Sequence, residues 1–262
     1  MDSITFDRVS FAYDNGRPVL RDVSLAIHPG EVVALVGRSG SGKSTALRLI
    51  NRLALPSSGR VSVEGRATHE WDPILLRRRA GFVLQDIALF PHMTVAENIG
   101  LIARIERWSA DRIDARVQEL LALTGLPKDF ADRWPGEISG GQQQRVGVAR
   151  ALMMDPPILL MDEPFGALDP LTRLSLHREL RRIQSALHKT IVLVTHDLRE
   201  AFSLGDRVGV IDEGQVVFDG PPDKLRESLH PFVHELLATL ELRDSDNGGA
   251  WRGPANGTVT RE

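Results

Sequence analysis

A glycine-rich segment between a strand pattern and a helix pattern constrains this chain most. Residues 37–45 read Gly-Arg-Ser-Gly-Ser-Gly-Lys-Ser-Thr and match the phosphate-loop pattern G-x-x-x-x-G-K-[ST]. Residues 31–36 are mostly apolar and β-branched, as in a buried parallel strand, and residues 46–50 have a helical pattern. In this setting backbone N–H groups and a helix N-terminus together bind phosphate. The segment therefore predicts a nucleotide-binding α/β fold.

The loop also predicts roles for its side chains. We expect Lys43 to reach the β- and γ-phosphates and the Ser44 hydroxyl to ligate Mg²⁺. A glycine-rich turn that binds nothing is the alternative, and the full spacing with both flanks argues against it. The residues expected at the nucleotide are Gly37, Arg38, Ser39, Gly40, Ser41, Gly42, Lys43, Ser44 and Thr45.

Composition narrows the class of protein. The 262 residues carry a net charge of −3, which gives no general electrostatic reason to bind nucleic acid or an anionic membrane. Cysteine is absent, which excludes disulfides, thiolate metal sites and a cysteine nucleophile. Residues 1–5 lack the basic and apolar pattern of a secretory signal, and no run of about 18 apolar residues occurs. If the protein acts at a membrane, we expect a partner to hold it there.

Hydrophobic periodicity predicts two kinds of sheet. Alternation within residues 3–28 and at Val61 and Val63 predicts a small antiparallel layer. A mainly parallel sheet is predicted from further candidate strands at residues 81–85, 158–162, 191–195 and 208–211. Helices between the later strands predict a doubly wound α/β core.

Residues 88–155 predict an inserted helical subdomain. Thr94 to Glu97 fits a capping box, Ile99, Ile102 and Ile105 give a helical stripe, and Ser139 opens another helix. One nucleotide-binding domain is expected over 1–242, with short helices after Pro221 and over 231–242. The polar, glycine-containing residues 243–262 predict a disordered tail.

Two more segments carry candidate chemistry. Residues 158–161 are apolar, and Asp162 and Glu163 follow at the edge where open α/β sheets bind ligands. We expect Asp162 on the Mg²⁺ side and Glu163 to polarise the attacking water, although an acidic strand end can also simply face solvent. Ser139, Gly140, Gly141 and Gln142 form a second anion-binding helix start, unless Ser139 only caps its own helix. A second phosphate site on one chain suggests that it covers a nucleotide bound to another copy.

Together these segments resemble the ATP-binding cassettes of ABC transporters over about residues 3–240. Residues 37–45 resemble the Walker A loop, 158–163 resemble Walker B with its catalytic glutamate, and 139–142 resemble the family signature, with Ile138 where leucine is usual. The resemblance implies a P-loop NTPase fold that hydrolyses ATP with Mg²⁺.

The resemblance also implies roles for single residues. Gln85 corresponds to the residue that touches Mg²⁺ and the attacking water, Asp169 lies in a D-loop, His196 bonds the γ-phosphate, and Tyr13 stacks on adenine. None of Tyr13, Gln85 and His196 would indicate a site alone. We take them as site candidates because all three occur in the order and spacing of the family motifs. Lys43, Gln85, Glu163 and His196 are the expected catalytic residues.

The family likeness implies a head-to-tail dimer with two shared ATP sites, whose closure on ATP and reopening after hydrolysis drive transport. It implies integral membrane permease subunits that dock near residues 85–94, where Leu89, Phe90 and Met93 supply an apolar groove or pack inside the helical subdomain. An extracytoplasmic substrate-binding protein completes the implied system. The expected location is peripheral, at the cytoplasmic face of the inner membrane.

The cargo is predicted from residues 90–109, which resemble importers of osmoprotectants such as glycine betaine, choline or carnitine. Such subunits often carry a C-terminal regulatory module, and we expect none here. Import of an amino acid or another amine, and export of a lipid or drug, are alternatives. A soluble cassette protein would bring coiled-coil insertions, a second cassette or a basic nucleic-acid surface. A phosphotransferase kinase would leave the Ser139 helix unexplained.

Overall fold

The computed structural model describes residues 2–14, 16–166 and 168–246. Its larger sheet has six strands in the order β10-β9-β3-β8-β7-β6, with only β10 antiparallel to its neighbour. Its strands are β3 (Val32–Val36), β6 (Ala80–Val83), β7 (Ile158–Asp162), β8 (Thr190–Thr195), β9 (Arg207–Asp212) and β10 (Gln215–Gly220). The predicted mainly parallel sheet is confirmed, whereas β10 was not predicted because its half-buried residues lack a clear alternation.

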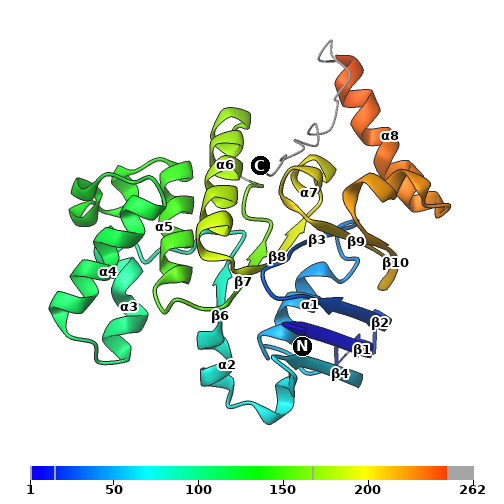
Figure 1. Cartoon of the computed structure of the whole chain (residues 1–262), viewed down its shortest axis with the longest axis horizontal. Helices are drawn as coiled ribbons and strands as arrows, with labels where there is room; N and C mark the ends of the chain where they lie inside the picture. Colours follow the sequence, from blue (N-terminus) through cyan, green and yellow to red (C-terminus); the bar gives the residue numbers. More distant parts are fainter. Residues whose placement is uncertain (1, 15, 167, 247–262) are drawn as a thin grey trace, which may run out of the picture.

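The predicted antiparallel layer is also confirmed, as a sheet in the order β2-β1-β4-β5. Its strands are β1 (Ile4–Ala12), β2 (Pro18–Ile27), β4 (Ser58–Val63) and β5 (Arg66–Ala67). Helix α1 (Lys43–Ile50) packs between this sheet and the six-stranded one (Figure 1). Successive residues of β3 point to opposite faces of the six-stranded sheet. Val33 and Leu35 belong to the core shared with α1, whereas Ala34 and Val36 belong to the core on the other face.

Three helices lie between β6 and β7 and form the green part of Figure 1. They are α3 (Val95–Ile105), α4 (Ala110–Leu123) and α5 (Gly140–Leu152). Thr94 begins α3 through the predicted capping box, and Ile99 is fully buried. Ile105, predicted on the same stripe, is 61% exposed, so the structure covers only part of that stripe. The short 3₁₀ helices η2 (Lys128–Asp132) and η3 (Pro135–Glu137) connect α4 to α5.

The remaining helices surround the parallel sheet. Helix α2 (Pro73–Arg79) was not predicted, because only Leu76 is buried in it and its sequence therefore shows no helical periodicity. Helix α8 continues to Asp246, so residues 243–246 of the predicted tail are helical, since extending a helix that has already formed costs much less than starting one. Residues 247–262 lie outside the described residues. The bounds are η1 (Thr68–Glu70), α2 (Pro73–Arg79), α6 (Pro170–Leu187), α7 (Leu198–Leu204), η4 (Pro222–Glu227) and α8 (Pro231–Asp246).

Within the described residues, no helix combines the length and the apolar character that a membrane crossing requires.

Candidate active site

The phosphate loop lies between the end of β3 and the start of α1, as the sequence predicts. Two of its glycines are required by close approach of other backbone. A Cβ at Gly37 would lie 2.1 Å from the Ile211 carbonyl oxygen, and one at Gly42, where φ is 108°, would lie 2.9 Å from the Val19 carbonyl oxygen. The strands β2 and β9 therefore press on the loop and fix its path.

Lys43 is buried in the centre of this loop. Its Nζ donates to the carbonyl oxygens of Gly37, at 2.8 Å, and Arg38, at 2.7 Å. Burial lowers the pKa of Lys43, while Glu163 and Asp162 act in the opposite direction. The Ser41 hydroxyl oxygen is buried and has no hydrogen-bond partner within the described part of the chain. An ammonium group and an unpaired hydroxyl in a glycine cradle fit a bound phosphate chain.

Ser44 and Asp162 meet although 118 residues separate them. The Ser44 hydroxyl donates to Asp162 Oδ1 at 2.7 Å. A hydroxyl and a carboxylate are hard oxygen ligands that suit Mg²⁺, which commonly uses few protein groups together with substrate phosphates. Within 2–14, 16–166 and 168–246, no group of three or more His, Cys, Asp or Glu side chains could hold a metal ion. The donor set therefore fits Mg²⁺ that arrives with a nucleotide.

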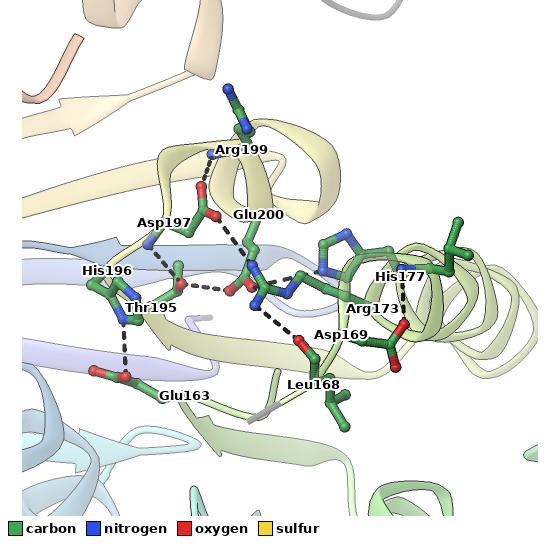
Figure 2. Close-up of polar contacts among 11 residues, drawn as sticks. Glu163, Leu168, Asp169, Arg173, His177, Thr195, His196, Asp197, Arg199 and Glu200 are labelled. Atoms are coloured by element: carbon green, nitrogen blue, oxygen red, sulfur yellow. Dashed lines mark hydrogen bonds and ion pairs between the residues drawn. The ribbon is translucent and has the colours of Figure 1, made fainter. Parts of the chain in front are cut away.

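Glu163 and His196 form the second pair at this edge of the sheet. Glu163 Oε2 lies 3.0 Å from His196 Nδ1, and a dashed line marks this contact in Figure 2. The Glu163 backbone adopts φ 43°, just past the end of β7, and its amide donates to the Val194 carbonyl oxygen at 2.9 Å. This turn aims the carboxylate at the loop after β8, which carries His196. Because the imidazole is 63% exposed, it can contact a ligand above the sheet edge.

Tyr13 and Gln85 differ in how firmly the structure ties them to this site. The Tyr13 hydroxyl lies 3.5 Å from Thr45 Oγ1 and accepts from Arg48 Nη1 at 3.3 Å. The Tyr13 ring, 44% exposed, can still receive a base. Gln85 lies exposed two residues after β6, and no hydrogen bond joins it to Ser44 or Asp162 in the described structure.

The Ser139 segment lies away from the phosphate loop of its own chain. Ser139 Oγ accepts from the Gln142 amide at 3.3 Å, and Gln142 Oε1 accepts from the Ser139 amide at 2.8 Å. This capping box satisfies the start of α5, yet Ser139 and Gly140 remain exposed. In the view of Figure 1, β6 and β7 lie between α5 and α1.

Asp169 begins α6, and its Oδ1 accepts from the amides of Leu171 and Thr172, each at 3.1 Å. Hydrogen bonds from Thr172 hold the pKa of the Asp169 carboxyl below its ordinary value. A Cβ at Gly141 would lie 2.3 Å from Thr172 Cγ2, so the starts of α5 and α6 are in close contact. Asp169 and the Ser139 segment therefore occupy neighbouring ends of two packed helices.

The expected docking side chains separate in the structure. Leu89 packs on the core that contains α3 to α5, whereas Phe90 is 40% exposed. A groove of about 420 Å³, which neither side chain lines, lies between α2 and β6 on one side and α3 and α5 on the other. Its apolar lining comes mainly from Ile74, Phe82, Leu101, Ile102, Ile105 and Met154. Sequence reasoning missed this groove because Ile74 and Ile105 look like ordinary helix residues.

Polar residues behind His196 were also missed. Arg173, Thr195, Asp197 and Glu200 contact one another where α6 and α7 meet β8 (Figure 2). The one sign of this cluster in the sequence was the charged Glu200 in the short helix pattern that follows His196. Nothing in that pattern distinguishes a buried glutamate from an exposed one.

Comparison with known proteins agrees with this architecture. The family model described as ABC transporter matches residues 20–166. The chain is 45% identical over 245 residues to the choline transport ATP-binding protein OpuBA of Bacillus subtilis (strain 168), covering 93% of this chain and 64% of that protein. It is 46% identical to the glycine betaine uptake system ATP-binding protein YehX of Escherichia coli (strain K12), covering 91% and 78%.

A solved structure has the same fold. The dimeric post-hydrolysis structure of the ATP-binding cassette MJ0796, bound to ADP and Pi, aligns with a TM-score of 0.75 at 35% identity, covering 84% of this chain and 98% of that one. The fold is that of the P-loop NTPases, as predicted. The chain belongs to the ABC transporter family.

Proposed function

We propose that this chain is the ATP-hydrolysing subunit of an importer for quaternary amines such as glycine betaine, choline or carnitine. The observation that carries the ATPase assignment is the meeting of two pairs at one sheet edge, Ser44 with Asp162 and Glu163 with His196. Lys43 lies close enough to both carboxylates for their charges to act on it. Lys43 and the loop hold the phosphates of ATP, and Mg²⁺ bound at Ser44 and Asp162 supplies positive charge against them.

Glu163 acts as the group that orients and polarises the attacking water. Its carboxylate stands just beyond β7, and His196 fixes one of its oxygens. The other oxygen is then directed to the water, while the exposed imidazole reaches the γ-phosphate. We place Tyr13 against adenine, with its hydroxyl held by Arg48. We also propose that Gln85, which is exposed after β6, contacts the metal and the attacking water.

The first experiment tests this chemistry. Glu163→Gln keeps the size of the side chain and removes the charge, so ATP hydrolysis should fall by a factor on the order of 10²–10⁴ while ATP still binds. Phosphate release and equilibrium binding of a fluorescent ATP analogue measure the two effects. Glu213→Gln is the matched control, because Glu213 also has a positive φ, of 45°, but is exposed in the turn before β10. Normal hydrolysis by Glu163→Gln would show that the assignment is wrong.

Two copies share each site in this proposal. Ser139 and Gly140 lie exposed, and their segment is apart from the phosphate loop of its own chain, so it can cover a nucleotide held by a second copy. A head-to-tail pair places both segments at each of two ATP molecules. The dimeric assembly of MJ0796 supports this arrangement.

Complementation tests the shared site. Lys43→Ala and Ser139→Arg chains should each be inactive alone, and mixing them should restore up to about a quarter of the wild-type rate through random pairing. The matched control replaces the Ser139→Arg chain in this mixture by one chain that carries both substitutions, because every phosphate loop then lacks Lys43 and no dimer has an intact site. No recovery in the first mixture would contradict the shared site.

The cargo and the partners are proposed from the relatives and from the surface. OpuBA and YehX are transport proteins for choline and glycine betaine, and this chain spans 64% and 78% of their lengths. The groove lined by Ile74 and Ile105 gives a membrane permease an apolar place to dock, and Arg77 and Arg150 add positive charge to it. The permease then holds the chain at the cytoplasmic face, where it works with an extracytoplasmic substrate-binding protein.

Transport by the full complex tests the cargo. Vesicles that contain the chain, its permease and its binding protein should take up radiolabelled glycine betaine or choline when ATP is supplied to the side of the chain. Ile74→Glu should abolish uptake while the isolated chain still binds ATP. Absence of uptake and binding of every quaternary amine would refute the cargo, whereas ATP hydrolysis would remain a separate result.

A further inference from the structure

A partly buried polar cluster behind His196 has no part in the chemistry proposed so far. It consists of Arg173 on α6, Thr195 and Asp197 on either side of His196, and Glu200 on α7, and it is called the Glu200 cluster below. Glu200 is only 3% exposed. A buried carboxylate is costly unless it is paired and hydrogen-bonded, so its contacts show what it holds in place.

The first contact fixes the backbone on both sides of His196. The Thr195 hydroxyl donates to Glu200 Oε2 at 2.5 Å and accepts from the Asp197 amide at 3.0 Å. A hydroxyl has one hydrogen to donate, and the Thr195 hydroxyl donates it to Glu200. Its lone pairs are therefore free to accept the hydrogen bond from the Asp197 amide. The carboxylate thereby sets the orientation of a hydroxyl that closes the turn around His196.

The second contact joins this turn to the loop that carries Asp169. Arg173 Nη2 donates to the Leu168 carbonyl oxygen at 3.2 Å, and Nη1 lies 3.5 Å from Asp197 Oδ2. The Nε of the same guanidinium is 3.8 Å from Glu200 Oε1. Because the guanidinium is planar and rigid, these contacts fix the two loops relative to each other (Figure 2).

The chemistry of the cluster indicates more than packing. Burial raises the pKa of Glu200 above its ordinary value, and the Thr195 hydroxyl opposes that shift. His177 Nε2 is 4.0 Å from Glu200 Oε1, but burial lowers the pKa of His177 to about 4, so His177 is neutral at pH 7 and brings no balancing charge. Apolar residues would fill this space at less cost, whereas directional bonds to two loops require polar ones.

We propose that Glu200 and Arg173 are positioning residues for ATP hydrolysis: Glu200 holds the His196 turn through the Thr195 hydroxyl, and Arg173 locks that turn to the loop before Asp169. The inference rests on the proposed function, in which His196 contacts the γ-phosphate. A loose turn misplaces the imidazole, and a misplacement of about 1 Å can cost on the order of 10²-fold in rate. Binding of ATP by Lys43 and the phosphate loop does not use these contacts.

A matched pair at Thr195 tests the hydroxyl itself. Thr195→Val keeps the shape and removes the hydroxyl, whereas Thr195→Ser keeps the hydroxyl and removes a methyl group. We expect Thr195→Val to lower kcat for ATP hydrolysis about 10- to 100-fold, with KM and the Kd for ATP within about twofold of wild type. Thr195→Ser should keep kcat within about threefold of wild type. A purely structural role would not separate kcat from KM or the two variants from each other.

A second pair tests the joint between the loops and controls for stability. Arg173→Lys keeps the charge, but a single ammonium cannot contact both loops in the same geometry, so kcat should fall about tenfold with unchanged ATP affinity. Leu180→Ala is the control, because Leu180 is buried on the same helix without a polar contact to either loop. It should lower Tm and leave kcat per folded molecule near wild type.

The outcomes separate the inference from the proposed function. The inference would be overturned if Thr195→Val kept the wild-type kcat, or if kcat fell equally in Thr195→Val and Thr195→Ser. A loss of ATP affinity in Thr195→Val that matched its loss of kcat would also overturn it. If Thr195→Val does not fold, Arg173→Lys decides, and wild-type kcat there overturns the inference. Failure of the wild-type chain to hydrolyse ATP, or unimpaired hydrolysis by Glu163→Gln, would instead reject the proposed function.

Discussion

His177 gives a prediction whose size follows directly from its surroundings. The imidazole lies on α6, almost fully buried, with its ring edge-on to Phe165 at 4.5 Å between centroids. Burial is the main cause that lowers the pKa of His177 from 6.5 to about 4, and Arg173 and Arg181 act in the same direction. Between these two pKa values the unfolded chain binds a proton that the folded chain does not. Stability should therefore fall as pH drops from 6.5 towards 4.

The linkage relation gives the magnitude. Between pH 7.5 and pH 5.0, pKa values of 6.5 unfolded and about 4 folded correspond to a loss of about 2 kcal/mol of unfolding free energy from this one group. A domain of this size loses about 2–4 °C in Tm per kcal/mol, so the loss corresponds to about 4–8 °C. Burial raises the pKa of Glu200, so this group makes stability rise as the pH drops. Its contribution cancels when the wild-type chain is compared with a His177 variant, because both contain Glu200.

The assay compares Tm of the wild-type chain and His177→Gln at pH 7.5 and 5.0, followed by circular dichroism. The variant loses packing against Phe165 at both pH values, and the difference between the two pH values isolates the proton. Wild type should lose about 4–8 °C more than the variant on acidification. His92→Gln, at an exposed histidine, controls for removal of an imidazole as such. Equal acid sensitivity of wild type and His177→Gln would refute the reasoning.

Three further predictions concern the fold and the metal. Asn98→Ala should lower the free energy of unfolding by about 2–4 kcal/mol, because the fully buried Asn98 side chain accepts from the Phe90 backbone N–H and donates to the carbonyl oxygens of residues 90, 93 and 94. An unchanged urea midpoint would contradict this. Gly37→Ala should lower Tm and abolish ATP binding, because its Cβ meets β9 backbone at 2.1 Å, whereas Gly136→Ala, with open space around it, should do neither. Removing Mg²⁺ with a chelator should stop hydrolysis, and Ser44→Ala should raise the Mg²⁺ concentration for half-maximal activity about tenfold or more; wild-type Mg²⁺ dependence in Ser44→Ala would refute that ligand assignment.

The sequence alone predicts the parts of this protein whose chemistry is local. The loop over 37–45 is recognisable because glycines, Lys43 and Ser44 have fixed spacing between a strand and a helix. Buried parallel strands also stand out, because both faces are covered and their residues are almost all apolar. The Thr94 capping box is formed by residues three apart, so the start of α3 is local as well. The fold class follows from these elements taken in order.

Local pattern fails where burial depends on distant segments. Ile105 continues a helical stripe but lies exposed beside the groove, and α2 has too few buried residues to show a period. Leu89 packs inward although Phe90 next to it is exposed, and neither outcome is written in the adjacent residues. Each depends on which surface another element covers, which the chain settles only by folding.

The site divides in the same way. The sequence predicted which residues would bind phosphate and metal, but the 2.7 Å contact of Ser44 with Asp162 exists only because parallel β3, β8 and β7 bring their carboxyl ends to one edge. The Glu200 cluster depends still more on tertiary structure, since α6, α7 and the end of β8 must converge before a glutamate can become buried and paired. Sequence determined which groups are available, and packing decided which of them meet, because hydrogen bonds and desolvation act between neighbours in space.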